Sequence, residues 1–314
     1  MEYLILLLKK HGIVDIAINL HYLGPQIAKY FGDGSRWGVN LHWSHEDKLW
    51  GDAGSVKRIQ EFFGEETFLV IGGDDLTDMD LSAVIGTHKE KGGIATLALS
   101  IVDDPSEYGI VQLDENARIT RFLEKPKGEV FSRTANTGVY IFEPSVFDLI
   151  PAHTFFLFGK ELFPLIMEQG LPMYGHVTKA YWKDVGNLKI YRQTQLDILE
   201  GAVEVDLPLK LTGEQVWQGE GVQIDPTAEI GTLVAIGNNV TIGAGAKIGD
   251  KTIIADNCRI EAGATVNASI LWEGATVLAN THIERCIVGQ NTTVGTNHAI
   301  FDGIIADPNR PMNI

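Results

Sequence analysis

Two acidic positions in the first two hundred residues follow apolar or aromatic segments and could bind a metal ion. Asp74 comes after Phe68–Gly72, which reads as a strand, and Asp184 comes after the aromatic pair Tyr181 and Trp182. An acid at the tip of a strand, beside glycines that open the backbone, suits a divalent cation that holds phosphate oxygens. Each acid could equally belong to a turn or to the start of a helix, because nearby side chains suit helix capping. Those capping candidates are Thr77, Asp78 and Asn187.

Further polar residues lie next to segments that read as strands. Glu124 and Lys125 end a predicted hairpin, while Asn136 and Thr137 open a strand. Lys125 could offer a point positive charge to a phosphate, or it could be an ordinary solvated lysine. Asn136 and Thr137 suit either the hydroxyl groups of a sugar or a simple turn. Taken singly, these residues leave a binding role and a structural role open.

Strands and helices alternate along this part of the chain. The alternation predicts a parallel sheet with helices on both faces, in which ligands bind beyond the carboxyl ends of the strands. Tyr108–Glu124 departs from the alternation and predicts a hairpin around the turn Asp114–Asn116. The predicted strands are Ile13–Asn19, Phe68–Gly72, Ile94–Ile101 and Val139–Phe142, and the predicted helices are Gln26–Phe31, Val56–Phe63, Leu81–Lys91 and Lys160–Glu168.

A ladder of aliphatic residues spaced six apart dominates the last third of the chain. It runs without a miss from Ile224 to Val266, and glycine often follows the aliphatic residue directly. A period of six fits neither an α-helix nor an amphipathic strand, and it is typical of a hexapeptide β-helix. The register slips by one near Leu271 and again near Val288. We therefore expect a parallel β-helix whose aliphatic residues point into its interior.

The composition favours a soluble, cytoplasmic protein with two cores. The chain has 314 residues, of which 45% are hydrophobic, and its formal net charge is -16. Such a charge disfavours a nucleic-acid or anionic-membrane surface but allows a local basic pocket. The opening run Leu4–Leu8 is too short for a membrane span and reads as the face of a helix. Cys258 and Cys286 lack metal-ligand spacing and read as buried thiols.

Several short segments occur in one order ahead of the hexads, and together they are more specific than any one alone. This order, followed by a hexapeptide β-helix, resembles the sugar-phosphate nucleotidylyltransferases, and within them the mannose-1-phosphate guanylyltransferase (GDP-mannose pyrophosphorylase) branch. With the ladder, the resemblance predicts an α/β, Rossmann-like nucleotidyltransferase domain over residues 1–205. A linker over 206–220, a left-handed parallel β-helix over 221–306 and a tail over 307–314 would follow. The segments are Gly51–Ser55, Gly73–Asp74, Tyr108–Gly109, Glu124–Pro126, Asn136–Gly138 and Trp182–Gly186.

The resemblance implies an enzyme that joins a sugar 1-phosphate to a nucleoside triphosphate and releases pyrophosphate. The substrates it implies are mannose 1-phosphate and GTP, and the cofactor is Mg²⁺. Asp74 and Asp184 match the family's two metal-binding aspartates, and Lys125 matches the lysine beside the sugar phosphate. The remaining matches are Gly51 and Gly54, in the loop that approaches the nucleotide, and Gly109, Glu124, Asn136 and Thr137, at the positions that grip the sugar.

Three departures from the family pattern bear on activity. Asp52 stands where threonine is common, and Asp75 adds a carboxylate beside Asp74. We also expect the chain to lack the family's first strand and its Gly-Gly-x-Gly-Thr-Arg loop, whose N–H groups cradle the triphosphate. A truncated enzyme with impaired activity is therefore expected.

Two other functional classes are weighed against the enzyme. The first alternative is a non-catalytic regulatory or assembly subunit of a nucleotide-sugar pyrophosphorylase, which would keep the sugar pocket and the β-helix. A hexapeptide acyltransferase is a weaker match, because no extended loop interrupts the hexads to enclose an acyl carrier. For each of these functional classes, the flat faces of the β-helix predict a homo-oligomer.

Overall fold

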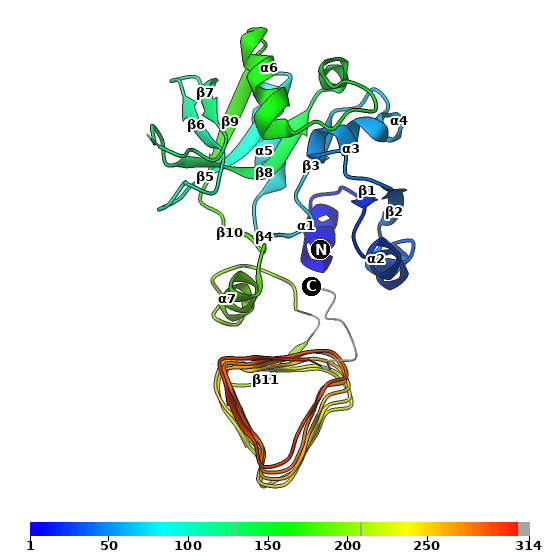
Figure 1. Ribbon diagram of the computed structural model, residues 1–314, viewed down its shortest axis with the longest axis vertical. Helices are drawn as coiled ribbons and strands as arrows, with labels where there is room; N and C mark the ends of the chain where they lie inside the picture. The colour runs from blue at the N-terminus through cyan, green and yellow to red at the C-terminus, as the bar shows by residue number, and fades with distance from the viewer. Residues whose placement is uncertain (129, 208, 307–314) are drawn as a thin grey trace. The chain divides into compact units, whose positions relative to one another are not determined.

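The computed structural model describes residues 1–128, 130–207 and 209–306 and divides into two compact units. Unit 1 spans Met1–Gly186 and unit 2 spans Asn187–Ile314. Figure 1 shows an α/β body for unit 1 and a coil of triangular cross-section for most of unit 2. Within the described ranges, no helix is long and apolar enough to cross a membrane. The tail expected over residues 307–314 lies outside the described residues.

A mixed sheet forms the centre of unit 1. Strand β8 runs antiparallel to β3, β5 and β6, whereas β5 and β9 run parallel. The prediction of a parallel sheet is wrong for β8, because the β6–β7 hairpin interrupts the strand–helix alternation and the chain returns beside it. The predicted hairpin itself is confirmed. The strands are β3 (Phe68–Val70), β5 (Ala95–Ile101), β6 (Ile110–Leu113), β7 (Ile119–Leu123), β8 (Thr134–Phe142) and β9 (Met173–Thr178).

Helices cover both faces of this sheet, as predicted. Successive side chains of a strand point to opposite faces, and in β5 Leu97 and Leu99 pack in one core cluster with Phe163. Ala98 packs in a second cluster with Leu81. The first cluster is formed with α3 (Asp52–Arg58), α4 (Gln60–Phe63), η2 (Pro144–Leu149), η3 (Phe158–Leu162) and α6 (Phe163–Glu168), and the second with α5 (Leu81–Lys91).

The first helix, α1 (Glu2–Lys10), buries the apolar run that the sequence predicts to be a helix face. Leu7 and Leu8 join the cluster formed with α5, whereas Ile5 joins a separate cluster with Trp37 and Leu41. Helix α1 therefore links the central sheet to a separate parallel pair of strands. The elements of that part are β1 (Asp15–Leu20), α2 (Gly24–Phe31), η1 (Ser35–Trp37) and β2 (Asn40–His45).

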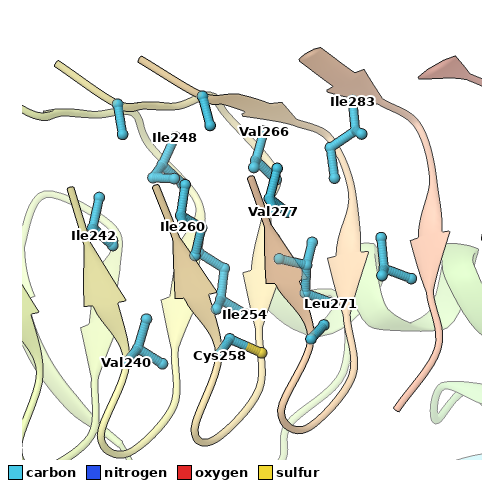
Figure 2. Packing of buried hydrophobic residues seen from close by; sticks show 14 of the residues in the cluster. Val240, Ile242, Ile248, Ile254, Cys258, Ile260, Val266, Leu271, Val277 and Ile283 are labelled. Carbon is cyan, nitrogen blue, oxygen red and sulfur yellow. The ribbon is translucent and has the colours of Figure 1, made fainter. Parts of the chain in front are cut away.

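Unit 2 is a parallel β-helix built from three sheets. Its aliphatic residues stack in the interior, as Figure 2 shows for Ile242, Ile260 and Val277 of neighbouring coils. The first sheet contains β11 (Lys210–Gly213), β12 (Val216–Gln218), β15 (Val234–Ile236), β18 (Ile253–Ile254), β21 (Ile270–Leu271), β24 (Ile287–Val288) and β27 (Ile304–Ile305). The second contains β13 (Gln223–Ile224), β16 (Thr241–Ile242), β19 (Arg259–Ile260), β22 (Thr276–Val277) and β25 (Thr293–Val294). The third contains β14 (Glu229–Ile230), β17 (Lys247–Ile248), β20 (Thr265–Asn267), β23 (His282–Glu284) and β26 (Ala299–Phe301).

The slips in the hexad ladder correspond to a shortened corner of the coil. Ile242 pairs with Ile260, three hexads further on, whereas Ile260 pairs with Val277, one residue short of three hexads. The missing residue lies between Val266 of the third sheet and Leu271 of the first, where the spacing falls from six to five. Both predicted slips are therefore confirmed, and the aliphatic stack continues across them.

Helix α7 (Leu188–Leu199) packs on the β-helix within unit 2. The Trp272 indole N–H donates to the Tyr191 hydroxyl at 3.2 Å, and the Arg192 guanidinium donates to the Ala268 carbonyl at 3.4 Å. The first compact unit ends at Gly186, and the bounds 1–205 of the first domain stay a prediction. The expected linker over 206–220 also contains regular structure, since β12 already pairs with β15 of the β-helix.

Both cysteines are buried inside the β-helix, as the sequence predicts. Cys258 is 1% exposed and Cys286 is 0% exposed. Burial raises the pKa of the Cys258 thiol to about 11, so this thiol is not a nucleophile at neutral pH. Self-association through the β-helix stays a prediction.

Candidate functional site

A short antiparallel pair of strands brings together acids that lie 110 positions apart in the sequence. In unit 1, β4 (Asp75–Thr77) pairs with β10 (Trp182–Asp184), and Asp184 lies directly opposite Asp75. Asp74 precedes β4 by one residue, so the two predicted metal ligands come from adjoining strand ends. The side chains of Asp74 and Asp184 are both exposed, which leaves their carboxylates open to a ligand.

Asp75 has a different environment from its two acidic neighbours. Its side chain is 7% exposed, and the Trp182 indole N–H donates to its Oδ1 at 3.1 Å. Burial, followed by the charge of Asp74, raises the pKa of Asp75 to about 8. The buried Asp75 therefore supports the pairing of β4 with β10 through the Trp182 indole, while Asp74 faces solvent.

Lys125 supplies a positive charge near Asp184. Burial and the charge of Asp74 raise the pKa of Asp184, while the charge of Lys125 lowers it. Lys125 has a left-handed backbone with φ 41°, and its N–H donates to the Tyr108 carbonyl at 3.1 Å. The Tyr108 ring meets the Trp182 ring edge-on, with 5.1 Å between centroids. The end of the hairpin and β10 thus contribute to one site.

The two exposed carboxylates fit a magnesium ion that arrives with a phosphate ligand. In the part of the chain that the structure describes, no group of three or more His, Cys, Asp or Glu side chains is arranged to hold a metal ion. Mg²⁺, however, commonly binds through one or two carboxylates and completes its shell with water and substrate phosphates. Asp74 and Asp184 are the residues that would hold it.

The alternative capping role applies to Asn187 but not to Thr77 or Asp78. Asn187 caps α7, since its Oδ1 accepts the N–H three residues further on at 3.0 Å. The Thr77 hydroxyl donates to the Tyr181 carbonyl at 2.6 Å, and Asp78 Oδ1 accepts the Tyr181 N–H at 2.8 Å. Helix α5 is capped by Asp80 instead. Thr77 and Asp78 therefore anchor the chain that leads into β10.

Unlike Asp74 and Asp184, Glu124 has a half-buried carboxylate, which lies between two glycines. A methyl group on Gly109 would lie 2.8 Å from Glu124 Oε2, and one on Gly159 would lie 2.4 Å from it. Burial raises the pKa of Glu124, and the charge of Lys125 opposes the shift. No donor among the described residues is hydrogen-bonded to this half-buried carboxylate. Its free acceptor positions suit the hydroxyl groups of a ligand.

Asn136 and Thr137 have different environments, although they are adjacent in β8. Asn136 is half-buried, and its Nδ2 donates to the Tyr140 hydroxyl at 2.8 Å. Thr137 is 1% exposed, and its hydroxyl donates to the Ala98 carbonyl at 2.9 Å. The Thr137 side chain thus secures β8 to β5, and of the two only Asn136 keeps a surface for a ligand.

The structure gives Gly51 and Gly54 a packing role. A methyl group on Gly51 would lie 2.4 Å from the Phe156 carbonyl oxygen, and one on Gly54 would lie 2.7 Å from the Thr154 carbonyl oxygen. The Gly54 N–H donates to the Phe156 carbonyl at 3.0 Å. Both glycines therefore let α3 approach the segment 154–156 closely. Their contact with a nucleotide stays a prediction.

Sequence reasoning missed what Asp52 and Gly159 do. Asp52 Oδ1 accepts the N–H groups of Ala53 and Phe158, both at 2.7 Å. An acid in the first turn of a helix is a recognisable signal, but nothing local in the sequence points to a partner more than a hundred residues away. Gly159 lies in a segment with no family motif, and only the fold places it against Glu124.

Comparison with known proteins decides the family. Residues 1–201 match the nucleotidyl transferase family. The chain belongs to the nucleotidyl transferase family. Residues 213–309 match the left-handed β-helix domain described for the EIF2B epsilon subunit, so the predicted fold class, a Rossmann-like nucleotidyltransferase domain followed by a left-handed parallel β-helix, is confirmed.

Two relatives show what kinds of nucleotidyl transferase resemble this one. The UTP–glucose-1-phosphate uridylyltransferase of Synechocystis sp. is 37% identical over 250 residues, which cover 75% of this chain and 61% of that protein. The mannose-1-phosphate guanylyltransferase catalytic subunit beta of Drosophila melanogaster is 33% identical over 287 residues, which cover 90% of this chain and 73% of that protein. The chain thus spans about three fifths of the length of the Synechocystis protein.

A solved structure shares the fold of this nucleotidyl transferase. It is a Bacillus anthracis protein described as a glucose-1-phosphate thymidylyltransferase, with a TM-score of 0.58 and 23% sequence identity. The match covers 68% of this chain and 84% of that one. At this level of identity the match supports the fold alone.

Proposed function

We propose that this nucleotidyl transferase moves a nucleotidyl group from a nucleoside triphosphate to a sugar 1-phosphate. The observation that supports the proposal best is the meeting of Asp74 and Asp184 across β4 and β10, with Lys125 beside Asp184. Two exposed carboxylates and one cation suit a phosphate that arrives with a divalent metal. Transfer to phosphorus depends on positioning and charge neutralisation more than on covalent chemistry, and these residues can supply both.

In the proposed reaction an oxygen of the sugar phosphate attacks the α-phosphorus of the triphosphate. The bond from that phosphorus to the pyrophosphate oxygen breaks, and pyrophosphate leaves with the electron pair. When bound by Asp74 and Asp184, Mg²⁺ supplies positive charge to the phosphate oxygens. Lys125 adds a point charge for the sugar phosphate. Glu124 and Asn136, both half-buried, hydrogen-bond the sugar hydroxyls and orient the attacking group.

We propose mannose 1-phosphate and GTP as the substrate pair. The support is the resemblance to the guanylyltransferase branch, together with the Drosophila relative that covers 90% of this chain. A second pair, glucose 1-phosphate and UTP, is favoured by the higher identity, 37%, to the uridylyltransferase of Synechocystis. The two sugars differ at one hydroxyl and the two bases differ in size, so a substrate panel separates the alternatives.

We also propose that the active form contains a further strand and a glycine-rich loop with an arginine. Among the described residues, β1 pairs only with β2 and β3 pairs only with β8, so each has one unpaired edge. Ile16 of β1 and Leu69 of β3 are partly buried and pack against one core cluster, and an unpaired strand edge offers its N–H and C=O groups to a further strand. A strand between them would satisfy both edges and lead into a loop of N–H donors for the triphosphate.

The test measures pyrophosphate release with GTP, UTP, ATP and dTTP, each paired with mannose 1-phosphate or glucose 1-phosphate. It uses the 314-residue chain and a form that carries the glycine-rich amino-terminal segment of a family relative. In the active form, Asp74→Asn and Asp184→Asn should each reduce Mg²⁺-dependent turnover at least about 10²-fold, because a metal ligand is lost. Glu115→Gln, at the exposed tip of the hairpin, is the matched control and should leave turnover unchanged.

Each possible result of this test has a separate meaning. Turnover by both aspartate variants close to that of the control would overturn the metal-binding assignment. Full turnover by the 314-residue chain would overturn the proposal that the glycine-rich loop is needed, since loss of even one preorganised donor costs about 10²–10³ in rate. No turnover by either form with any pair would favour the non-catalytic regulatory or assembly subunit.

A further inference from the structure

The Glu124 carboxylate is confined by two backbone segments that have no side chain at the point of contact. Gly109 approaches it from the start of β6, and Gly159 approaches it from the first turn of η3. Normal contacts of a Cβ atom with a carboxylate oxygen are longer than 3 Å, whereas a Cβ on Gly159 would lie 2.4 Å from Oε2. Any side chain at position 159 would therefore displace either η3 or the carboxylate.

The position of Gly159 depends in turn on Asp52. Asp52 Oδ1 accepts the Phe158 N–H at 2.7 Å and also the Ala53 N–H at 2.7 Å, so it ties the start of α3 to the residue just before Gly159. Phe158 is 3% exposed and packs in the core cluster of the sheet, which fixes the direction of this turn. The Leu157 N–H is bonded to Glu161 Oε2 at 2.8 Å. The turn that meets Glu124 is therefore held from both sides.

We propose that Asp52 and Gly159 are positioning residues for Glu124 on the sugar side of the site. Asp52 fixes the first turn of η3, and the missing side chain of Gly159 lets that turn close on the carboxylate. Together they set the place from which Glu124 can accept hydrogen bonds from sugar hydroxyls. The inference rests on the proposed function and adds residues that act through Glu124. It also gives Asp52 a role inside the protein in place of a contact with the nucleotide.

The test compares the binding of mannose 1-phosphate, glucose 1-phosphate and GTP to the full chain by titration calorimetry with Mg²⁺ present. Gly159→Ala and Asp52→Ala should weaken sugar 1-phosphate binding about 10-fold to 10²-fold, the loss expected when hydrogen bonds to a charged group are broken. GTP binding by Gly159→Ala should stay within a factor of about two, since Gly159 lies outside the loop Gly51–Gly54 that is predicted to approach the nucleotide. The matched control is Gly86→Ala in α5, where a methyl group meets nothing within 4 Å.

A double variant and a conservative variant separate positioning from general damage. In Gly159→Ala/Glu124→Ala the added methyl group has no carboxylate to displace, so this double variant should bind the sugar 1-phosphate no more weakly than Glu124→Ala alone. Asp52→Asn keeps the Oδ1 acceptor for the Phe158 N–H and should bind like the unaltered chain. Wild-type affinity in both alanine variants, or an equal loss for GTP, would overturn the inference.

Crystal structures of the unaltered chain and of Gly159→Ala, both without a ligand, test whether Gly159 positions the Glu124 carboxylate. We expect the Glu124 carboxylate to move by about 1 Å, since that is the overlap a methyl group would create. An unmoved carboxylate would refute the positioning role whatever the binding data show. Failure of the unaltered chain to bind any sugar 1-phosphate would instead count against the proposed function, while a displaced carboxylate would still support the positioning role.

Discussion

Replacement of Gly51 by alanine tests whether this glycine is needed for packing. Its backbone has φ 75° and ψ 168°, a conformation that is almost restricted to glycine. An added methyl group would also lie 2.4 Å from the Phe156 carbonyl oxygen. The conformational strain costs about 1–3 kcal/mol, and the overlap costs about 1–3 kcal/mol more. The free energy of unfolding of unit 1 should therefore fall by roughly 2–6 kcal/mol.

Two further glycines isolate the part of this loss that comes from the contact. Gly64 has φ 57° and ψ -131°, also unfavourable for alanine, but a methyl group there meets nothing within 4 Å. Gly64→Ala should therefore cost the strain alone, about 1–3 kcal/mol. Gly86 lies inside α5 with open space around it. Gly86→Ala should stabilise the protein by about 0.5–1 kcal/mol, because glycine is unfavourable inside a helix.

The assay is urea unfolding followed by tryptophan fluorescence, since four of the six tryptophans lie in unit 1 and one of them, Trp50, directly precedes Gly51. The free energy of unfolding should fall further in Gly51→Ala than in Gly64→Ala. The difference between the two losses measures the contact with Phe156. Equal losses in the two variants would refute the packing argument. Unchanged stability of Gly51→Ala together with weaker GTP binding would show that the glycine serves the nucleotide alone.

Two other predictions concern the interior of the β-helix and a buried histidine. Ile260→Ala should lower the free energy of unfolding of unit 2 by about 2–5 kcal/mol in a denaturant titration, because Ile260 is 1% exposed and its removal leaves a cavity. The control is Arg259→Ala, which alters the exposed neighbouring residue and should lower the same free energy by less than about 0.5 kcal/mol. A hydrogen bond with His88 lowers the pKa of Glu143 from its ordinary value of 4.5. The ionised carboxylate therefore adds stability above pH 4.5 that is lost as the pH falls through the lowered pKa. Glu143→Gln should be less stable than the unaltered chain at pH 7, and thermal unfolding at pH 3 should show the difference shrinking; a difference independent of pH would contradict the assignment.

The β-helix could be predicted closely because its information is local and repeated. Each hexad carries its own inward aliphatic residue and its own corner, so the spacing from Ile224 to Val266 predicts the stack directly. The slip near Leu271 could also be read, since a shortened corner leaves the stack intact. The start of the β-helix is harder to read, because in β12 Gln218 stands opposite Ile236, where the ladder otherwise has an aliphatic residue.

The α/β unit could be predicted as a set of elements but not as a sheet. Hydrophobic periodicity shows where strands and helices lie, but strand direction depends on which segments pair over long separations. The sequence indicates the hairpin between β5 and β8, but it does not show that β8 then runs antiparallel beside β5. For the same reason the sequence predicts Asp74 and Asp184 as metal ligands, but only the fold shows that the pairing of β4 with β10 brings the two acids together.

The adjacent acids Asp74 and Asp75, where β4 begins, show why residue type alone could not assign roles at this site. Successive residues of an extended segment point to opposite sides, so Asp74 is exposed while Asp75 is buried beside the Trp182 indole. Burial raises the pKa of Asp75 to about 8 and keeps it mostly neutral at pH 7. The site then exposes two carboxyl groups, those of Asp74 and Asp184, near Lys125, while the third is buried. That arrangement favours a divalent cation bound together with phosphate, and it depends on the burial of Asp75 and on its hydrogen bond with the Trp182 indole.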